Sequence, residues 1–115
     1  MTDAELDGLR DRLAALAGED AAIVEELVDS LVATNAEDLQ ALRMALAAGD
    51  FEAVAACAHR LKSSAKMLAC SGLAGVCESL EHFGPDGDSR TAHALLTLLA
   101  DALARLNARL VAYHR

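Results

Sequence analysis

A histidine in the middle of the third predicted helix lies close to both lysines of the chain. Lys62 and Lys66 are the only two lysines, and both follow His59 within two helical turns. At ~100° per residue, these three side chains and Ser63 fall on one side of a helix. Because His59 lies off the apolar stripe of this segment, we expect its imidazole to be at least partly exposed. The stripe comprises Val54, Ala58, Leu61, Ala65 and Leu68.

An exposed imidazole beside ammonium groups can carry a phosphoryl group for a short time. The neutral ring is the nucleophile, and lysine offsets the negative charge of the phosphoramidate. Ser63 is small and leaves open space over the ring. The sequence has no glycine-rich phosphate loop and no kinase signature, so we expect no kinase activity of its own. Another protein would have to bring the phosphate to His59.

The composition predicts one all-α domain. The 115 residues suit a single domain over residues 1–115, with the bundle core at about 20–113. Hydrophobic residues make up 54% of the chain, mostly Ala and Leu, whereas 3% are aromatic and one residue is proline. These proportions favour helices over strands.

The net charge and the cysteines exclude several classes of partner and site. A net charge of −8 argues against nucleic acid or an anionic membrane as the partner. The three cysteines form no CxxC pair, which favours a reduced compartment and predicts no metal site. The polar N-terminus shows no signal peptide, and charges interrupt every apolar run. We therefore expect a cytoplasmic protein.

Helix breaks divide the chain into five helices. We predict helices over about residues 3–16, 21–48, 51–69, 72–83 and 89–113, separated by breaks that contain glycine. In the second helix the inward stripe starts at Ile23 and is interrupted by Thr34 and Asn35, while Val24 and Val28 belong to a second stripe. Short turns between long helices predict an antiparallel up-down-up-down four-helix bundle with a short extra N-terminal helix.

The run Ala58-His59-Arg60-Leu61-Lys62-Ser63-Ser64-Ala65 resembles the signature of histidine-containing phosphotransfer (HPt) domains. The similarity extends to residues 45–50 before this helix and to residues 73–81 after it. It implies a four-helix bundle that relays phosphoryl groups between receiver domains in two-component signalling. By position, His59 would accept the phosphoryl group at Nε2 and Lys62 would steady it. The family often has glycine where this chain has Ala69. We expect this departure to matter little, although it would straighten the helix end.

Glu81 is expected to orient the imidazole. His59 precedes the turn at residues 70–72 by about 16 Å of helix, and Glu81 follows the turn by about 14 Å. In an antiparallel hairpin the two residues lie at nearly the same height, and the resemblance implies that a carboxylate here accepts a hydrogen bond from Nδ1. That bond would leave Nε2 available. The alternative is that Glu81 is a solvated acid at a helix end.

The resemblance also implies partners. We expect receiver domains of response regulators or of a hybrid histidine kinase, with Mg²⁺ supplied by the receiver and no cofactor in this chain. The docking surface would include Ser63, Lys66 and Met67, together with Val24 and Val28 as exposed apolar positions. The chain itself is expected to be a monomer, and its starting methionine favours a free-standing protein over a domain of a larger kinase.

Two other functions compete with phosphotransfer. The first is a non-catalytic helical protein-interaction module, in which His59 has no chemistry. The second is a bundle that binds a metal or a small ligand, which would call for Glu-x-x-His pairs on facing helices. The sequence contains no such pair, because Glu81 and His82 are adjacent and Glu78 precedes His82 by four residues.

Overall fold

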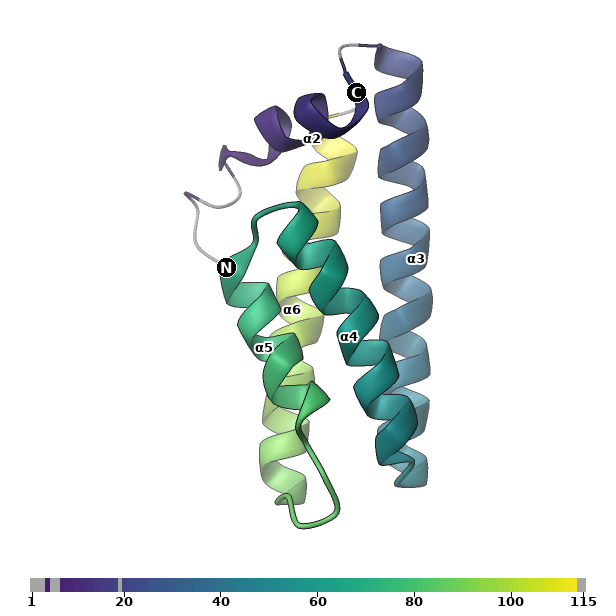
Figure 1. Ribbon diagram of the computed structural model, residues 1–115, viewed down its shortest axis with the longest axis vertical. Coiled ribbons are helices and arrows are strands. Elements are labelled where there is room, and N and C mark those ends of the chain that lie inside the picture. Colours follow the sequence, from purple (N-terminus) through teal and green to yellow (C-terminus); the bar gives the residue numbers. More distant parts are fainter. Residues whose placement is uncertain (1–3, 5–6, 19, 114–115) are drawn as a thin grey trace.

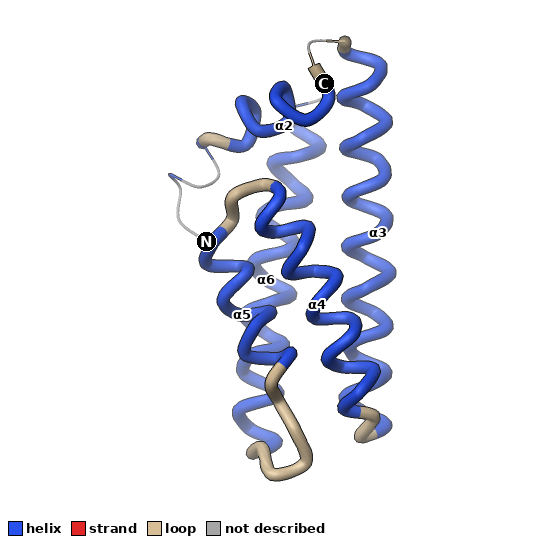
Figure 2. Tube along the Cα trace, in the orientation of Figure 1, coloured by secondary structure: helices blue, strands red, loops and turns tan. Residues whose placement is uncertain are grey.

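Four antiparallel helices form the body of the protein in a computed structural model that describes residues 4, 7–18 and 20–113 (Figure 1). They are α3 (Ala21–Ala48), α4 (Phe51–Met67), α5 (Ser71–Glu81) and α6 (Ser89–Tyr113). The short helix α2 (Leu9–Ala17) crosses one end of this bundle and packs against α3 and α6. The part of the chain that the structure describes contains no strand (Figure 2). The predicted fold, a four-helix bundle with an extra N-terminal helix, is confirmed.

The helix bounds follow local capping signals. The Asp20 side chain accepts a hydrogen bond of 2.9 Å from the backbone N–H of Ala22, and Asp50 accepts one of 3.2 Å from Ala53. Gly49 ends α3 in the left-handed conformation, with φ of 68°, which glycine adopts without steric cost. The predicted bounds 21–48 and 89–113 are confirmed. The first helix was predicted over residues 3–16: Ala4 and Asp7 are helical, Gly8 forms a turn, and α2 then begins at Leu9. Thr2 followed by Glu5 has the form of a capping box, but both residues lie outside the described residues.

Helix α4 ends at Met67, two residues earlier than predicted, because the chain reverses through a Schellman motif. The N–H of Cys70 donates to the carbonyl of Ala65 over 2.8 Å, and the N–H of Ala69 donates to Lys66 over 3.0 Å. Ala69 takes the left-handed conformation that this motif requires, with φ of 57°. The expectation that alanine at this position straightens the helix end is therefore wrong.

Leucine dominates the core, to which all five helices contribute. The largest fully buried side chains are ten leucines and one valine: Leu9, Leu13, Leu42, Leu61, Leu68, Leu73, Leu80, Leu99, Leu106, Leu110 and Val28. Ile23 was predicted to point inward, but it is 48% exposed. It lies near the start of α3, which is longer than α4 and α5 and extends beyond them (Figure 1). No described helix is long and apolar enough to cross a membrane.

Candidate functional site

His59 lies on the outer surface of α4. Ala58 and Leu61, on the opposite side of the helix, face the core and are buried, which turns the imidazole outward. The His59 side chain is 61% exposed. Ser63, one turn later, donates a hydrogen bond of 3.1 Å to the backbone carbonyl of His59. Its hydroxyl is thereby held against its own helix, and the space above the ring stays open.

Glu81 approaches the imidazole from the neighbouring helix. It is the last residue of α5, and its Oε1 lies 3.2 Å from Nδ1 of His59. His59 and Glu81 are 22 residues apart in the sequence. The turn between α4 and α5 brings them to the same height along the two antiparallel helices, as the helix lengths predict. A ring protonated at Nδ1 donates this hydrogen bond to the carboxylate, so Nε2 carries a lone pair toward solvent.

Lys62 completes what we call the Glu81 cluster, which consists of His59, Lys62 and Glu81. Its Nζ lies 2.5 Å from Oε2 of Glu81, and the Lys62 side chain is only 14% exposed. The carboxylate thus bridges an imidazole with one oxygen and an ammonium group with the other. Sequence reasoning assigned Lys62 to the phosphoryl group and did not foresee this ion pair. The signal was present, since Lys62 follows His59 by one turn on the side that faces α5.

The charges of the Glu81 cluster stabilise one another. The hydrogen bond from Lys62 is the largest cause that lowers the pKa of Glu81, and partial burial opposes it. The hydrogen bond from His59 lowers this pKa further. The same contact with Glu81 raises the pKa of Lys62. At neutral pH the carboxylate is therefore ionised and the lysine is protonated, so a negative charge lies against Nδ1 of the imidazole.

The predicted docking residues divide into accessible and buried ones. Ser63, Lys66 and Met67 are exposed on α4, and Met67 keeps 45% of its surface in solvent. Val24 is half-buried on α3. Val28 is fully buried in the core, so its prediction as an exposed docking residue is wrong. Val28 faces the core, whereas Ile23 presents the exposed apolar side chain on this part of α3.

Two polar contacts that sequence reasoning missed fasten α4 to α3. Arg60, the residue after His59, donates from Nε to Asp38 on α3 over 3.0 Å, and its Nη2 lies 3.3 Å from the sulfur of Cys57. This interaction raises the pKa of Arg60, chiefly through the hydrogen bond to Asp38. Arg60 and His59 are adjacent in the chain. The ion pair between Arg60 and Asp38 therefore holds the backbone that carries the imidazole.

Asn35 makes the second contact, from the interior. It is 1% exposed and lies 3.4 Å from both Ser64 on α4 and Asn107 on α6. Its position in the inward stripe of α3 looked like an interruption in the sequence. In the structure the amide links three helices, and the break in the apolar pattern was the signal of a buried polar contact.

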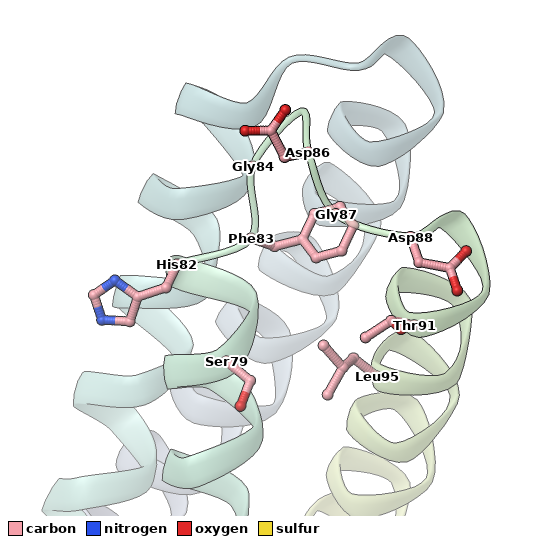
Figure 3. Close-up of a pocket in the computed structure, with 9 residues that line it drawn as sticks. All are labelled: Ser79, His82, Phe83, Gly84, Asp86, Gly87, Asp88, Thr91 and Leu95. Atoms are coloured by element: carbon pink, nitrogen blue, oxygen red, sulfur yellow. The ribbon is translucent and has the colours of Figure 1, made fainter.

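One cavity of the described structure lies away from the Glu81 cluster. It measures about 590 Å³ and lies between the end of α5, the loop at residues 82–88 and the start of α6 (Figure 3). The His82 ring points away from the cavity in this view, whereas Phe83 and Leu95 extend into it. No member of the Glu81 cluster lines it. Within residues 4, 7–18 and 20–113, no group of three His, Cys, Asp or Glu side chains could hold a metal ion.

Comparison with known proteins gives one match. Residues 26–109 match the family model of the Hpt domain. This range includes His59, Lys62 and Glu81, and it covers α4 and α5 completely and all of α3 and α6 except residues 21–25 and 110–113. No curated protein and no solved structure showed a significant match.

Proposed function

The chain belongs to the Hpt domain family, whose members carry out histidine phosphotransfer in two-component signalling, and we propose that it is a phosphorelay intermediate. In this proposal His59 accepts a phosphoryl group from an aspartate of one receiver domain and passes it to another. The observation that supports it most directly is an exposed imidazole whose Nδ1 lies 3.2 Å from a carboxylate. This arrangement leaves Nε2 as the accessible nucleophile.

The proposed transfer uses the groups of the Glu81 cluster in defined roles. The Nε2 lone pair attacks phosphorus of the aspartyl phosphate, the new N–P bond forms, and the bond from phosphorus to the aspartate oxygen breaks. The aspartate leaves as a carboxylate. The proton on Nδ1 stays on the ring, and Glu81 offsets the positive charge that develops there. In the reverse direction Nε2 is the leaving group.

Lys62 has two roles in this proposal. It keeps Glu81 ionised, because its ammonium group lies 2.5 Å from Oε2. An ammonium group has three donors, so a lysine that holds Glu81 retains donors for a phosphoryl oxygen. The chain would need no cofactor, since the receiver supplies the Mg²⁺ that neutralises the phosphoryl oxygens.

The proposed receiver contact surrounds His59. The small side chain of Ser63 would let the receiver approach His59 closely. Lys66 would contribute a positive charge, and Met67 a flexible apolar contact. Val24 and Ile23 lie in the first turn of α3, which extends beyond α4, so they would contact the receiver only at the margin of this surface. We further propose that residues 1–115 act as one monomeric domain, with the Glu81 cluster as its phosphotransfer site.

A transfer experiment tests the site. The protein is incubated with a receiver domain that carries radioactive phosphate on its aspartate, and we expect a label that is stable to base and labile to acid. His59→Gln should abolish the label, whereas His93→Gln, which alters an exposed histidine on α6, should retain it. A label that persists in His59→Gln would overturn the site assignment. Receiver binding without any label in the wild-type protein would favour the non-catalytic interaction module instead.

A further inference from the structure

A second, largely apolar groove is lined by residues of α3, α4, α6 and the loop at residues 82–88. These elements meet at the end of the bundle opposite α2 (Figure 1). The groove measures about 350 Å³ and lies between the last turns of α3 and the first turns of α6, beside the loop at residues 82–88. We call it the phenylalanine groove, after its two aromatic lining residues. Its apolar lining consists of Leu46, Ala47, Phe51, Phe83, Ala92 and Leu96.

The aromatic residues make this groove unlike the rest of the molecule. The chain contains only two phenylalanines, and both line the groove. Their ring centroids are 6.0 Å apart at an interplanar angle of 43°. Gly87 lies so close to Phe83 that a Cβ atom at this position would be 2.4 Å from the ring. Phe83 thus packs between Phe51 and Gly87. The lining residues Leu46, Phe51, Phe83 and Leu96 remain half-buried.

The charge at the groove is opposite to that of the chain as a whole. Arg43 and His93 line it and are exposed, and no acidic side chain lines it, although the chain has 18 acidic and 10 basic residues. The acidic residues of the nearby loop, Asp86 and Asp88, line the other cavity (Figure 3). Arg43 has no ion-pair partner within the described part of the chain, so its guanidinium is available to a ligand.

We propose that the phenylalanine groove binds a small carboxylic acid with an aryl or short alkyl body. The apolar part would lie on Phe51, Phe83 and Leu96, and the carboxylate would pair with Arg43, whose planar guanidinium suits two parallel hydrogen bonds to a carboxylate. The volume is at the lower end of the range for small-molecule sites. A recess of about 350 Å³ matches the size of a small molecule, which favours a small ligand over a macromolecule.

Titration with 4-phenylbutyrate tests this proposal on the whole chain. We expect saturable NMR shifts at the backbone amides of Arg43, Leu46, Ala92 and Leu96, with none at His59. The uncharged analogue 4-phenylbutan-1-ol should bind on the order of fivefold more weakly, because it lacks the charge-assisted pair with arginine. Arg43→Gln should remove this preference for the acid. Lys66→Gln, which removes an exposed charge on α4, should preserve it.

Filling the groove provides a test that does not depend on charge. Ala47 is exposed, so Ala47→Phe can place a ring in the groove without disturbing the core, and both probes should then lose their affinity. Equal affinities for acid and alcohol in the wild-type protein would overturn the assignment of Arg43. Shifts that do not saturate, or that cluster around His59, would overturn the groove as a ligand site, and so would unchanged binding to a folded Ala47→Phe variant.

Discussion

At the scale of single residues, Glu81 is shared between an imidazole and an ammonium group. Its Oε1 contacts His59 and its Oε2 contacts Lys62. Glu81→Ala removes the acceptor that keeps the proton on Nδ1, so the ring can also protonate at Nε2, which is then not a nucleophile. We expect phosphotransfer to slow by about tenfold, since one orienting contact is lost while the nucleophile remains. Stopped-flow or quenched transfer from a labelled receiver measures this rate.

The control for Glu81→Ala is Glu81→Gln, which keeps an acceptor but not the charge. Its rate should lie between that of the wild type and that of the alanine variant. Circular dichroism melts should show that both variants keep the bundle, because Glu81 is not part of the core. Wild-type transfer rates in Glu81→Ala would mean that Glu81 has no part in the reaction.

Lys62 should control the ionisation of Glu81. Because Lys62 is the largest cause that lowers the pKa of Glu81, Lys62→Met should raise that pKa, which NMR titration of the side-chain carboxyl measures directly. A lowered folded-state pKa contributes stability above the ordinary value of 4.5, and this contribution disappears as the pH falls through the lowered pKa. Lys62→Met should therefore destabilise the protein at pH 6 more than at pH 3.

Urea unfolding at these two pH values gives the comparison. Lys66→Met serves as the matched control, because the exposed Lys66 has no ion pair with Glu81 and its loss should not move the carboxyl titration. An unchanged Glu81 titration in Lys62→Met would show that the ion pair does not govern this carboxylate in solution.

Sequence reasoning reached His59 and Glu81 but not the partner of Lys62. His59 stood out through its position off the apolar stripe, and Glu81 through its height in the hairpin. The ion pair between Lys62 and Glu81 depends on how far α4 is rotated toward α5, and a helical wheel does not give that rotation. The misassignment of Val28 has the same origin, since a stripe of valines does not indicate which stripe of α3 faces the core.

At the scale of helices, Ala69 carries a backbone conformation better suited to glycine. It occupies the left-handed position of the Schellman motif that ends α4, with φ of 57°. Ala69→Gly should stabilise the protein by roughly 0.5–1 kcal/mol, because the steric cost of a Cβ in this conformation is removed and exceeds the entropy lost on folding. Urea unfolding monitored by circular dichroism measures the change.

Gly49 supplies the opposite substitution for comparison. It ends α3 with φ of 68°, and a Cβ there would meet no atom within 4 Å. Gly49→Ala should therefore destabilise by about 1 kcal/mol through backbone strain alone. If Ala69→Gly lowered the stability, the packing of the Ala69 methyl group would contribute more than the steric cost of its Cβ. The prediction that Ala69 is strained would then be wrong.

At the scale of the whole molecule, the bundle could be predicted because several helix ends have a local signal. Asp20 and Asp50 start helices, and Gly18 and Gly49 end them. The bound that sequence reasoning misplaced at the end of α4 lies where alanine takes the glycine position. The phenylalanine groove could not be predicted, because it requires α3, the loop at residues 82–88 and α6 to meet at one end of the bundle.

The three cysteines give the hairpin that carries His59 a built-in chemical reporter. Cys57 lies in α4, Cys70 in the turn and Cys77 in α5, and none is more than 4% exposed. Burial raises the pKa of the Cys77 thiol to about 11, which further suppresses its reaction with electrophiles in the folded state. A maleimide should therefore modify these thiols only when the packing around α4 and α5 opens. The alkylation rate, read by mass spectrometry, would report how often the hairpin opens, with no label on the phosphotransfer surface itself.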